Sequence, residues 1–511
     1  MNSRPDAPRD GVLVVVGSGI RLYREYLLAG AAREHPLWLF DSREPSWQTP
    51  YLAGSTLVDT SDPRALVDAA TALAATRPVD GVLCYTEALV EPAAAIVDSL
   101  GLPGMSREAV SVCRDKGRTR RRLAEAGVGQ PRFAAVPSLD EAARAAEAIG
   151  YPVVLKPRGL AGSLGVVHVP GPADLARAYR EATAPSYPGV PTYDAPVLVE
   201  EYADGPEISV DGLLADGVYR PLVLARKRVA MPPYFEEEGH LVDAADPLLT
   251  SPELLAFLTD VHRALGATGS LTHTELRLTA KGPRLIEVNA RLGGGLIPLL
   301  GRLAGGVDPG RAGARAALGL PVDAAGPEPA GEGRAGGRVA AVHFSYPAED
   351  CTVEAVRLPE EGAVPGLHHA AALAEPGDVL RLPPRGYISR YAYAICVADT
   401  VEECEESVAL ARAAVRLDHR PAPAFDPDAG PELAWSTAPP SPAPEGAAPD
   451  GIAPEGAAPE GAAPGGTAPE GAAPEGAAPG GTAPDGTTPQ AASAPEGPAP
   501  VAGAAPGGAV R

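Results

Sequence analysis

The stretch Leu285-Ile286-Glu287-Val288-Asn289-Ala290-Arg291 carries the pattern from which the rest of the chain is interpreted. Its apolar residues alternate with polar ones, as expected for a strand. Successive side chains of a strand point to opposite faces, so Glu287, Asn289 and Arg291 lie on one face. The stretch therefore predicts a strand that presents a carboxylate, an amide and a guanidinium side by side.

A second carboxylate, Glu275, lies twelve residues before Glu287 in another apolar segment. The intervening Thr279-Ala280-Lys281-Gly282-Pro283 suits a hairpin turn, and antiparallel pairing brings Glu275 close to Glu287 and Asn289. Two carboxylates and an amide oxygen are hard ligands, suited to Mg²⁺ or Mn²⁺ beside nucleotide phosphates. A solvated hairpin face is the alternative. We favour a metal site in a buried sheet, where carboxylates need a cation, because apolar residues surround it: Leu271, Leu276, Leu278, Leu285, Ile286 and Val288.

A phosphate-binding loop is indicated by the segment from Val153 to Gly165, in which an apolar strand delivers Lys156 to a glycine-containing loop. Glycines let backbone N–H groups approach phosphate oxygens, and lysine supplies a point charge. The loop contains Gly159, Gly162, Ser163 and Gly165. It is not a Walker A loop, because the lysine precedes the glycines. An ordinary glycine-containing turn is the alternative.

A third pattern follows the apolar strand Val197–Glu200, which continues into Glu201-Tyr202-Ala203 and, after a Gly-Pro turn, Glu207. Backbone groups at such a strand end can meet an adenine edge, and a carboxylate can bind ribose hydroxyls. Taken alone, acids at a strand end are usually solvated. Lys116, at the start of an Arg-rich helix predicted over 114–126, carries no information by itself.

The first hundred residues alternate between short apolar strands and helical stretches, which predicts a doubly wound α/β domain. The strands are Val12–Val16, Leu37–Phe40 and Gly81–Tyr85. Gly17-Ser18-Gly19 follows the first strand, but position 22 is leucine and not the third glycine of a dinucleotide fingerprint. A tight strand-to-helix turn is the better interpretation, and such a turn can still face an anionic substrate.

The composition of the chain divides it into further regions. Residues 321–337 are rich in Gly, Pro and Ala and suggest a linker to another α/β unit. After Pro421, prolines recur every five residues from Pro444 to Pro489, a pentapeptide pattern that cannot bury a core and predicts a disordered tail. The predicted domains are 11–113, 114–320 with a small lobe at 131–204 and a large lobe at 205–320, 338–419, and the tail at 421–511.

Charge and cysteine usage exclude several classes of protein. The net charge is −22 over 511 residues, which disfavours binding along a nucleic-acid backbone. The five cysteines are odd in number, widely spaced and contain no CxxC, so we expect reduced thiols in a cytoplasmic protein. We expect neither a signal peptide nor a membrane span, because no apolar run approaches the ~20 residues that a bilayer requires.

Taken in order, these motifs resemble the ATP-grasp superfamily of ATP-dependent carboxylate–amine ligases over about residues 11–320. Within it the chain is most similar to L-amino-acid ligases that form dipeptides. The unit at 338–419, with Pro384-Arg385-Gly386-Tyr387, is similar to the extra C-terminal domain of those ligases. The resemblance implies a preceding α/β domain, a two-lobed ATP-grasp module and a C-terminal α/β domain. One departure is Ala290, where the family often has proline.

The resemblance also implies a role for each matching residue. Lys116 and Lys156 would contact the phosphates of ATP, and the loop 159–165 would close over them. Glu200 and the backbone of Glu201, Tyr202 and Ala203 would bind adenine, and Glu207 ribose. Arg291 would hold the acyl phosphate or the carboxylate, with Glu275, Glu287 and Asn289 on the metal.

Further residues are expected around the two small-molecule substrates, a carboxylate and an amine. Lys227 and His240 belong to a second candidate lid, 226–240, and would contact phosphate or the amine acceptor. A solvated acidic loop is the alternative for this segment. His273 shares a strand face with Glu275 and is either a contact to the acyl phosphate or a satisfied buried histidine. Glu87 would hold a substrate ammonium, and Gly294 is expected at the substrate. A homodimer is one assembly that the resemblance allows. Another ATP-grasp carboxylate ligase (a carboxylase, a purine-pathway or a carbamoyl-phosphate enzyme) and a non-catalytic nucleotide-binding protein are the alternatives.

Overall fold

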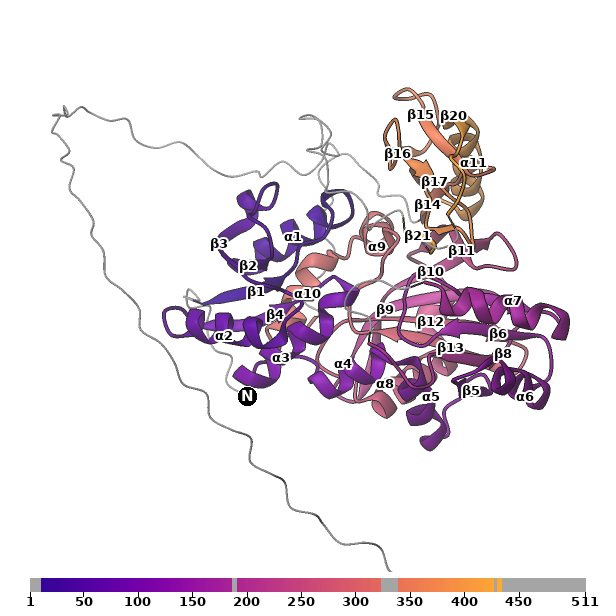
Figure 1. The fold of residues 1–511 in the computed structure, drawn as a ribbon. Coiled ribbons are helices and arrows are strands. Elements are labelled where there is room, and N and C mark those ends of the chain that lie inside the picture. Colours follow the sequence, from indigo (N-terminus) through magenta and orange to yellow (C-terminus); the bar gives the residue numbers. More distant parts are fainter. Residues whose placement is uncertain (1–10, 186–190, 323–338, 427–429, 434–511) are drawn as a thin grey trace, which may run out of the picture. The chain divides into compact units, whose positions relative to one another are not determined.

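The structure is a computed structural model that describes residues 11–185, 191–322, 339–426 and 430–433 (Figure 1). The predicted tail lies mostly outside these residues, as does most of the predicted linker at 321–337. Within them, no helix has the length and apolar character needed to cross a membrane.

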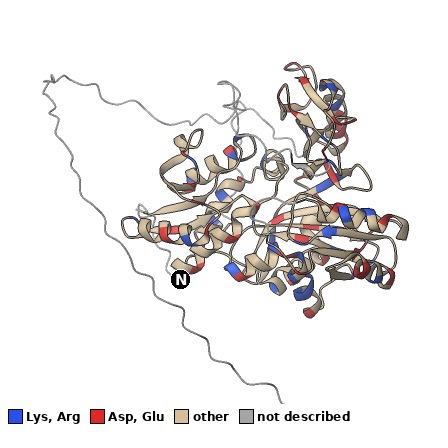
Figure 2. Cartoon of the chain, in the orientation of Figure 1, with Lys and Arg blue, Asp and Glu red and all other residues tan. Residues whose placement is uncertain are grey.

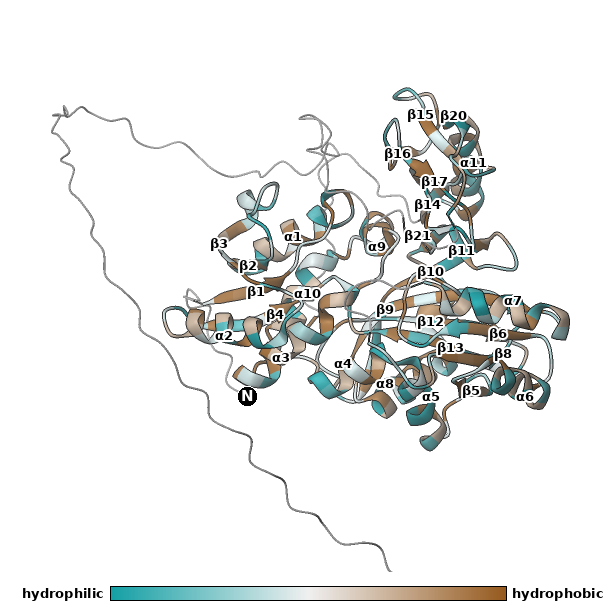
Figure 3. Ribbon diagram, in the orientation of Figure 1, coloured by the Kyte–Doolittle hydropathy of each residue, from teal (hydrophilic) through white to brown (hydrophobic). Residues whose placement is uncertain are grey.

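The N-terminal region forms a four-stranded parallel sheet in the order β3-β2-β1-β4. Its strands are β1 (Val12–Val16), β2 (Leu37–Asp41), β3 (Leu52–Leu57) and β4 (Val79–Leu83). The prediction missed β3, whose side chains alternate between half-buried and exposed and include Gly54 and Ser55. Every side chain of β1 is buried, and Figure 3 shows this strand as hydrophobic.

Helices cover both faces of this sheet, which confirms the doubly wound prediction. Leu13 and Val15 of β1 pack on α1 (Arg21–Glu34) and on α10 (Pro309–Ala317), whereas Val12 and Val14 pack on α2 (Pro63–Ala74) and α3 (Val90–Leu100). Helix α10 comes from far along the chain and approaches α1 closely. A Cβ on Gly310 would lie 2.1 Å from the carbonyl oxygen of Leu27, so only glycine fits there.

The region after α3 contains two short helices and the small lobe. The helix predicted at 114–126 is α5 (Lys116–Glu125), which is capped by Asp115, whose side chain accepts hydrogen bonds from the N–H groups of Gly117 and Arg118. Helix α4 (Arg107–Arg114) precedes it and was not predicted. The small lobe is an antiparallel sheet, β5-β8-β6-β7, backed by two helices. Its elements are β5 (Phe133–Val136), α6 (Leu139–Ile149), β6 (Val153–Pro157), β7 (Val167–Val169), α7 (Pro172–Thr183) and β8 (Val197–Glu201).

An eight-stranded sheet joins the large lobe to the C-terminal region, in the order β13-β12-β9-β10-β11-β14-β19-β16. The large lobe supplies β9 (Glu207–Ala215), β10 (Val218–Ala230), β11 (Glu236–Asp243), β12 (Thr272–Thr279) and β13 (Gly282–Asn289). The C-terminal region supplies β14 (Val339–Ser345), β16 (Leu367–Ala372) and β19 (Ala392–Ala398). Strand β11 pairs with β14, so the predicted 338–419 unit continues the sheet of the large lobe.

The remaining elements pack around these sheets. They are α8 (Pro252–Leu265), α9 (Ile297–Gly305), β15 (Cys351–Arg357), β17 (Val379–Leu380), β18 (Gly386–Tyr387), α11 (Val401–Ala414), β20 (Arg416–Pro421) and β21 (Glu432–Leu433). All five cysteines are free thiols, as predicted. Figure 2 shows basic and acidic residues interspersed over both lobes.

Candidate active site

A cavity of about 780 Å³, including space open to solvent, lies between the small lobe and the eight-stranded sheet. Its lining combines charged side chains with apolar ones, as sites for small molecules commonly do. We call it the central cavity. Most residues predicted for ATP and metal line it: Lys116, Lys156, Gly162, Ser163, Glu200, Glu201, Tyr202, Ala203, Glu207, Glu275 and Glu287.

Glu200 stands at the centre of a buried charge cluster on the small-lobe side. Its carboxylate accepts two hydrogen bonds from Arg120, at 2.8 and 3.0 Å, and forms an ion pair with Lys156 at 2.7 Å. Burial alone would raise the pKa of Glu200, but the two cations lower it to about 2. Arg120, which is 1% exposed, was not predicted, because the sequence of α5 contains several arginines that look alike. The Glu200 side chain therefore orients Lys156.

The two predicted metal carboxylates face each other across the hairpin β12–β13, as the sequence predicted. Glu275 is paired in register with Glu287, and His273 with Asn289. Glu275 contacts Lys227 at 2.8 Å, and Glu287 contacts Lys116 at 2.9 Å. Burial acts to raise the pKa of both carboxyl groups, yet both values are lowered, chiefly by Lys227 for Glu275 and by Lys116 for Glu287. Both groups are therefore ionised at neutral pH and repel each other.

A divalent cation fits this arrangement, since it would relieve the repulsion between two buried carboxylates. Asn289 donates its amide to Glu287 at 2.9 Å, which leaves its oxygen as a further ligand. Within the described residues, no three His, Cys, Asp or Glu side chains form a metal cage on their own. This composition suits Mg²⁺, which takes one or two carboxylates and completes its shell with phosphate oxygens and water.

Glu207, which also lines the central cavity, accepts hydrogen bonds from two cations. Arg277 contacts it at 3.0 Å and Lys227 at 2.8 Å. Arg277 also stacks over the rings of Tyr202 and Phe235, at 5.2 and 5.5 Å from their centroids. The sequence interpretation missed Arg277 and Phe235. Arg277 could have been found, because it lies two residues after Glu275 and so shares its strand face.

Three of the backbone groups near the predicted adenine site already have partners. The N–H of Glu201 donates to the carbonyl of Arg132 at 2.8 Å, the N–H of Tyr202 donates to the carbonyl of Pro152 at 3.3 Å, and the carbonyl of Ala203 accepts from Arg277 at 3.2 Å. The Glu201 side chain pairs with Arg132 at 3.2 Å. These three backbone groups would have to exchange their present partners to meet a base.

Lys227 links three carboxylates that line the central cavity. Its ammonium is 2% exposed and contacts Glu207, Glu237 and Glu275 at 2.8, 3.0 and 2.8 Å. Burial acts to lower its pKa, but the three carboxylates raise it well above the usual value.

The segment 226–240 is not a loop, because most of it belongs to the paired strands β10 and β11. Of the two predicted lids, only 159–165 is a loop, and Gly162 and Ser163 line the cavity there.

His273 is held between two carboxylates. Its Nδ1 lies 2.6 Å from Asp211 and its Nε2 lies 3.2 Å from Glu275. Burial acts to lower its pKa, but Asp211 and Glu275 raise it to about 9. Asp211, which the prediction missed, also accepts a hydrogen bond from the N–H of Gly293 at 3.1 Å. The sequence indicated Asp211 only as an acid inside the otherwise apolar part of strand β9.

A second group of predicted residues lies outside the central cavity, where the chain leaves β13. Glu87 contacts Arg114 and Arg291 at 2.6 Å each, so its carboxylate is already shared by two guanidinium groups. A Cβ on Gly294 would meet no atom within 4 Å, so this residue faces open space. A Cβ on Gly295 would lie 2.5 Å from the Nε2 of His240, whose pKa is lowered by burial.

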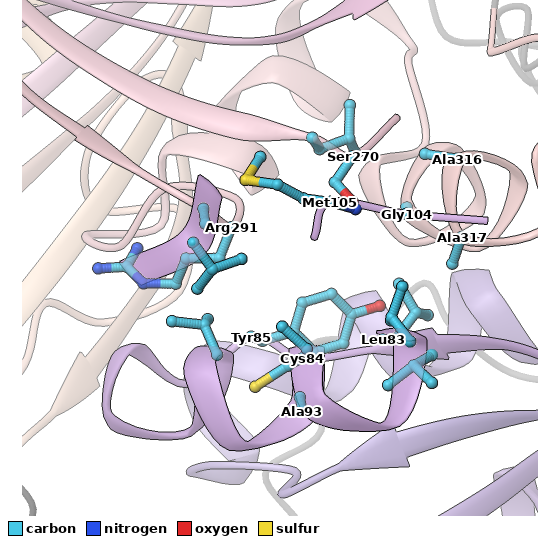
Figure 4. Close-up of a pocket in the computed structure, with 18 of the residues that line it drawn as sticks. Leu83, Cys84, Tyr85, Ala93, Gly104, Met105, Ser270, Arg291, Ala316 and Ala317 are labelled. Atoms are coloured by element: carbon cyan, nitrogen blue, oxygen red, sulfur yellow. Dashed lines mark hydrogen bonds between the residues drawn. The ribbon is translucent and has the colours of Figure 1, made fainter. Parts of the chain in front are cut away.

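A further cavity of about 600 Å³ runs along the open edge of β4 (Figure 4). Its lining is mostly apolar, with Met105 and Tyr85 on opposite sides in Figure 4. Arg291 lies at one end, and its guanidinium points away from Tyr85 and Cys84. This space therefore presents no charged head group to a ligand.

Comparisons with known proteins agree with this geometry. A model described as ATP-grasp domain matches residues 149–298, and one described as ATP-grasp N-terminal domain matches residues 42–104. Alanine--anticapsin ligase of Bacillus subtilis (strain 168) is 28% identical over 244 residues, which is 44% of this chain and 51% of that protein. Carnosine synthase 1 of Gallus gallus is 31% identical over 255 residues, 47% of this chain and 27% of that protein. The matched region therefore spans about half the length of the bacterial relative and 27% of the length of the avian one.

Solved structures show the same fold at low sequence identity. A crystal structure of L-amino acid ligase from Bacillus licheniformis aligns with a TM-score of 0.66 at 22% identity, covering 81% of this chain and all of that chain. N5-carboxyaminoimidazole ribonucleotide synthetase from Thermus thermophilus aligns with a TM-score of 0.56 at 17% identity, covering 79% of this chain and 98% of that chain.

Proposed function

We propose that this chain, which belongs to the ATP-grasp superfamily, is an ATP-dependent ligase that joins a carboxylate to an amine through a carbon–nitrogen bond. The observation that carries this proposal is the pair Glu275 and Glu287, two ionised carboxylates facing each other on the wall of the central cavity. Lys116 and Lys156 line the same cavity. Opposed carboxylates and lysines in one cavity are what a triphosphate with its divalent cation requires.

The proposed reaction has two steps. An oxygen of the substrate carboxylate attacks the γ-phosphorus of ATP, the bond to the β,γ-bridging oxygen breaks, and ADP leaves. The amine nitrogen then attacks the acyl carbon, phosphate departs and an amide remains. Lys116 and Lys156 neutralise charge on the transferring phosphoryl group. Glu275, Glu287 and Asn289 would hold Mg²⁺ or Mn²⁺, which supplies further charge neutralisation when bound.

We assign amino acids as the substrates, giving a dipeptide or a related amide. The names of the relatives support this assignment, since one is an alanine--anticapsin ligase and a matching structure is an L-amino acid ligase. Glu87 was expected to bind a substrate ammonium. Because two arginines already share its carboxylate, we propose instead that Glu87 orients Arg291 toward the acyl phosphate. Cytoplasmic location and a homodimer remain predictions.

The test is ADP release from MgATP across a matrix of L-amino-acid pairs, with the products identified by mass. The wild-type chain should release ADP only with particular pairs and yield the condensed product. Glu287→Gln should lower turnover about 100- to 1,000-fold, as for loss of one electrostatic group at a reacting centre. Glu253→Gln, an exposed carboxylate on α8, is the matched control and should keep full activity. Absence of ADP release with every pair would refute the assignment of amino acids.

A further inference from the structure

Three arginines lie near one another where the chain leaves β13, and two of them share one carboxylate. Arg114 and Arg291 both contact Glu87, and Arg24 of α1 reaches the carbonyl of Gly293. Arg291 also donates to the carbonyl of Leu292 at 2.8 Å, so Arg24 and Arg291 are held on adjacent peptide carbonyls. This cluster carries more positive than negative charge.

Arg24 is the member of the cluster that lacks a counter-ion. Within the described residues it forms no ion pair, and its one hydrogen bond, to Gly293, is 3.5 Å long, at the weak limit for such a contact. The groups that face it are Arg291, Tyr26, Tyr85 and Cys84, which are positive or neutral. Burial first, and then Arg291, lowers the pKa of Arg24. A partly buried guanidinium without an acid is costly unless an anion joins it.

The position of Arg24 is one where ligands reach a doubly wound sheet. The strand order β3-β2-β1-β4 reverses between β1 and β4, and ligands bind at the carboxyl ends of strands at such a reversal. The turn Gly17–Gly19 after β1 lies beside the segment after β4, since a Cβ on Gly17 would meet Leu89 and Thr86. The stem of Arg24 packs over Gly19, where a Cβ would lie 3.0 Å from its Cγ.

The Arg24 side chain is partly exposed, and open space lies beside the residue that follows its carbonyl contact. Arg24 is neither fully buried nor fully exposed, unlike the buried Arg114. The next residue after its carbonyl contact is Gly294, which faces open space. A small anion in that space would lie within reach of Arg24 and Arg291 together.

We infer that Arg24 binds the carboxylate of the amine substrate, the one carboxylate that is not activated by ATP. The inference rests on the proposed ligase function and adds a residue of the N-terminal domain that selects the amine. An amino acid would place its carboxylate on Arg24 and its amine toward the acyl group near Arg291. An amine without that carboxylate would lose the interaction.

The test compares an L-amino acid with its own amide as the amine substrate, at one fixed acyl donor. Arg24→Met removes the charge and keeps the stem over Gly19, and Arg24→Lys restores the charge. Arg21→Met, on the same helix and paired with Glu25 one turn along, is the matched control. Each variant is compared with the wild type for each amine separately, so the different basicities of the amino acid and its amide do not affect the result.

Arg24→Met should raise the KM for the amino acid about 10- to 100-fold, the effect of losing one charge-assisted hydrogen bond. The KM for the amide should change less than about twofold, and Arg24→Lys should recover part of the loss. Equal effects on both amines, or no effect on either, would overturn the inference while leaving the ligase intact. A wild-type chain that turns over no acid–amine pair would refute the proposed function, and the inference with it.

Discussion

Lys156 and Glu200 show how single residues set the chemistry of the central cavity. A lone ion pair would raise the pKa of a lysine, yet burial and the neighbouring Arg120 and Lys116 lower that of Lys156 to about 8. The pKa of Glu200, the ion-pair partner of Lys156, is itself lowered to about 2. The two pKa shifts are consistent because Glu200 is shared between Arg120 and Lys156. The effect of burial on the Lys156 ammonium therefore exceeds the effect of its half-share of the carboxylate. In the free protein, Lys156 therefore loses its proton near pH 8.

Lys156 should give the ATP reaction an alkaline limit. Its protonated form binds phosphate, so kcat/KM for ATP, which reports ionisations of the free enzyme, should fall above about pH 8 by tenfold per pH unit. Arg stays protonated throughout this range. Lys156→Arg should therefore lose the alkaline limb, even at lower overall activity, whereas Lys281→Arg in the exposed hairpin turn should retain it. If the fall in kcat/KM at alkaline pH persists in Lys156→Arg, a group other than Lys156 is responsible for it.

Gly294 should separate substrate binding from stability. Its φ is not positive and a Cβ meets no atom, so alanine should fold normally, with a change of about 0.5 kcal/mol or less. The added methyl would occupy the space assigned to the substrate. We expect the KM of an amino acid to rise about tenfold, as for modest overpacking, with the KM for ATP unchanged. Gly171→Ala, at another open position, is the control. Unaltered amino-acid kinetics would remove Gly294 from the substrate site.

For single residues, the sequence predicted those whose side-chain chemistry and spacing along the chain both indicate the same site. Glu275, Glu287 and Asn289 followed from strand alternation and a hairpin turn. Arg120 and Asp211 did not follow, because a buried arginine or aspartate is recognised only by the partner that folding brings to it. Glu87 was expected to hold a substrate ammonium, but it contacts two arginines that sequence spacing does not connect to it.

Among the elements, α8 is fixed to β12 by a histidine that the site does not use. His262 is fully buried; its Nδ1 lies 2.7 Å from the carbonyl of Leu258 and its Nε2 lies 2.7 Å from Thr272. Burial lowers the pKa of His262 to about 4. The folded pKa is thus below the unfolded value of about 6.5, so its contribution to stability is complete above pH 6.5 and is lost as the pH falls toward 4.

We expect His262→Gln to flatten this dependence. Glutamine does not titrate, so the difference in unfolding free energy between wild type and variant should shrink by about 3 kcal/mol between pH 7 and pH 4. Urea unfolding at several pH values measures it. His419→Gln, on the exposed strand β20, should follow the wild type. Parallel curves for wild type and His262→Gln would contradict the assignment.

Strands and helices with a clear period were predicted well, and irregular ones were not. The hairpin β12–β13 was found because it buries apolar side chains such as Leu276, Leu285 and Val288. Strand β3 was missed because it is half-exposed and contains glycine and serine, which weaken the strand pattern. The segment 226–240 was expected to be a loop because the adjacent acids Glu236–Glu238 suggest exposure to solvent. In the structure Glu236 is 2% exposed and accepts from Tyr346 at 3.0 Å, a partner from the C-terminal region.

For the whole chain, the eight-stranded sheet is the feature that sequence could not predict. Strand β14 follows a long segment without strand pattern, yet it pairs with β11 in register from Gly239–His343 to Asp243–Val339. Arg390 of the C-terminal region also reaches Glu237, one of the carboxylates on Lys227. The C-terminal region is therefore part of the framework of the site.

Two truncations should behave differently. A chain ending at residue 433 keeps every strand of the eight-stranded sheet and every residue assigned to the site, so it should retain kcat/KM within about twofold. A chain ending at residue 322 lacks β14, β19 and β16 and exposes the edge of β11, so it should aggregate or unfold. Light scattering and ADP release measure both. Full activity in the shorter chain would contradict the structural role assigned to the C-terminal strands.

The central claim, that a carboxylate is activated by phosphoryl transfer from ATP, is tested most directly with an ¹⁸O-labelled acid. In the proposed reaction a carboxylate oxygen bridges to phosphorus and leaves with phosphate when the amine attacks. Turnover of an acid carrying ¹⁸O in both carboxylate oxygens should therefore place one ¹⁸O in inorganic phosphate for each amide formed, with ADP as the nucleotide product. Unlabelled phosphate, or release of AMP and pyrophosphate, would contradict the account.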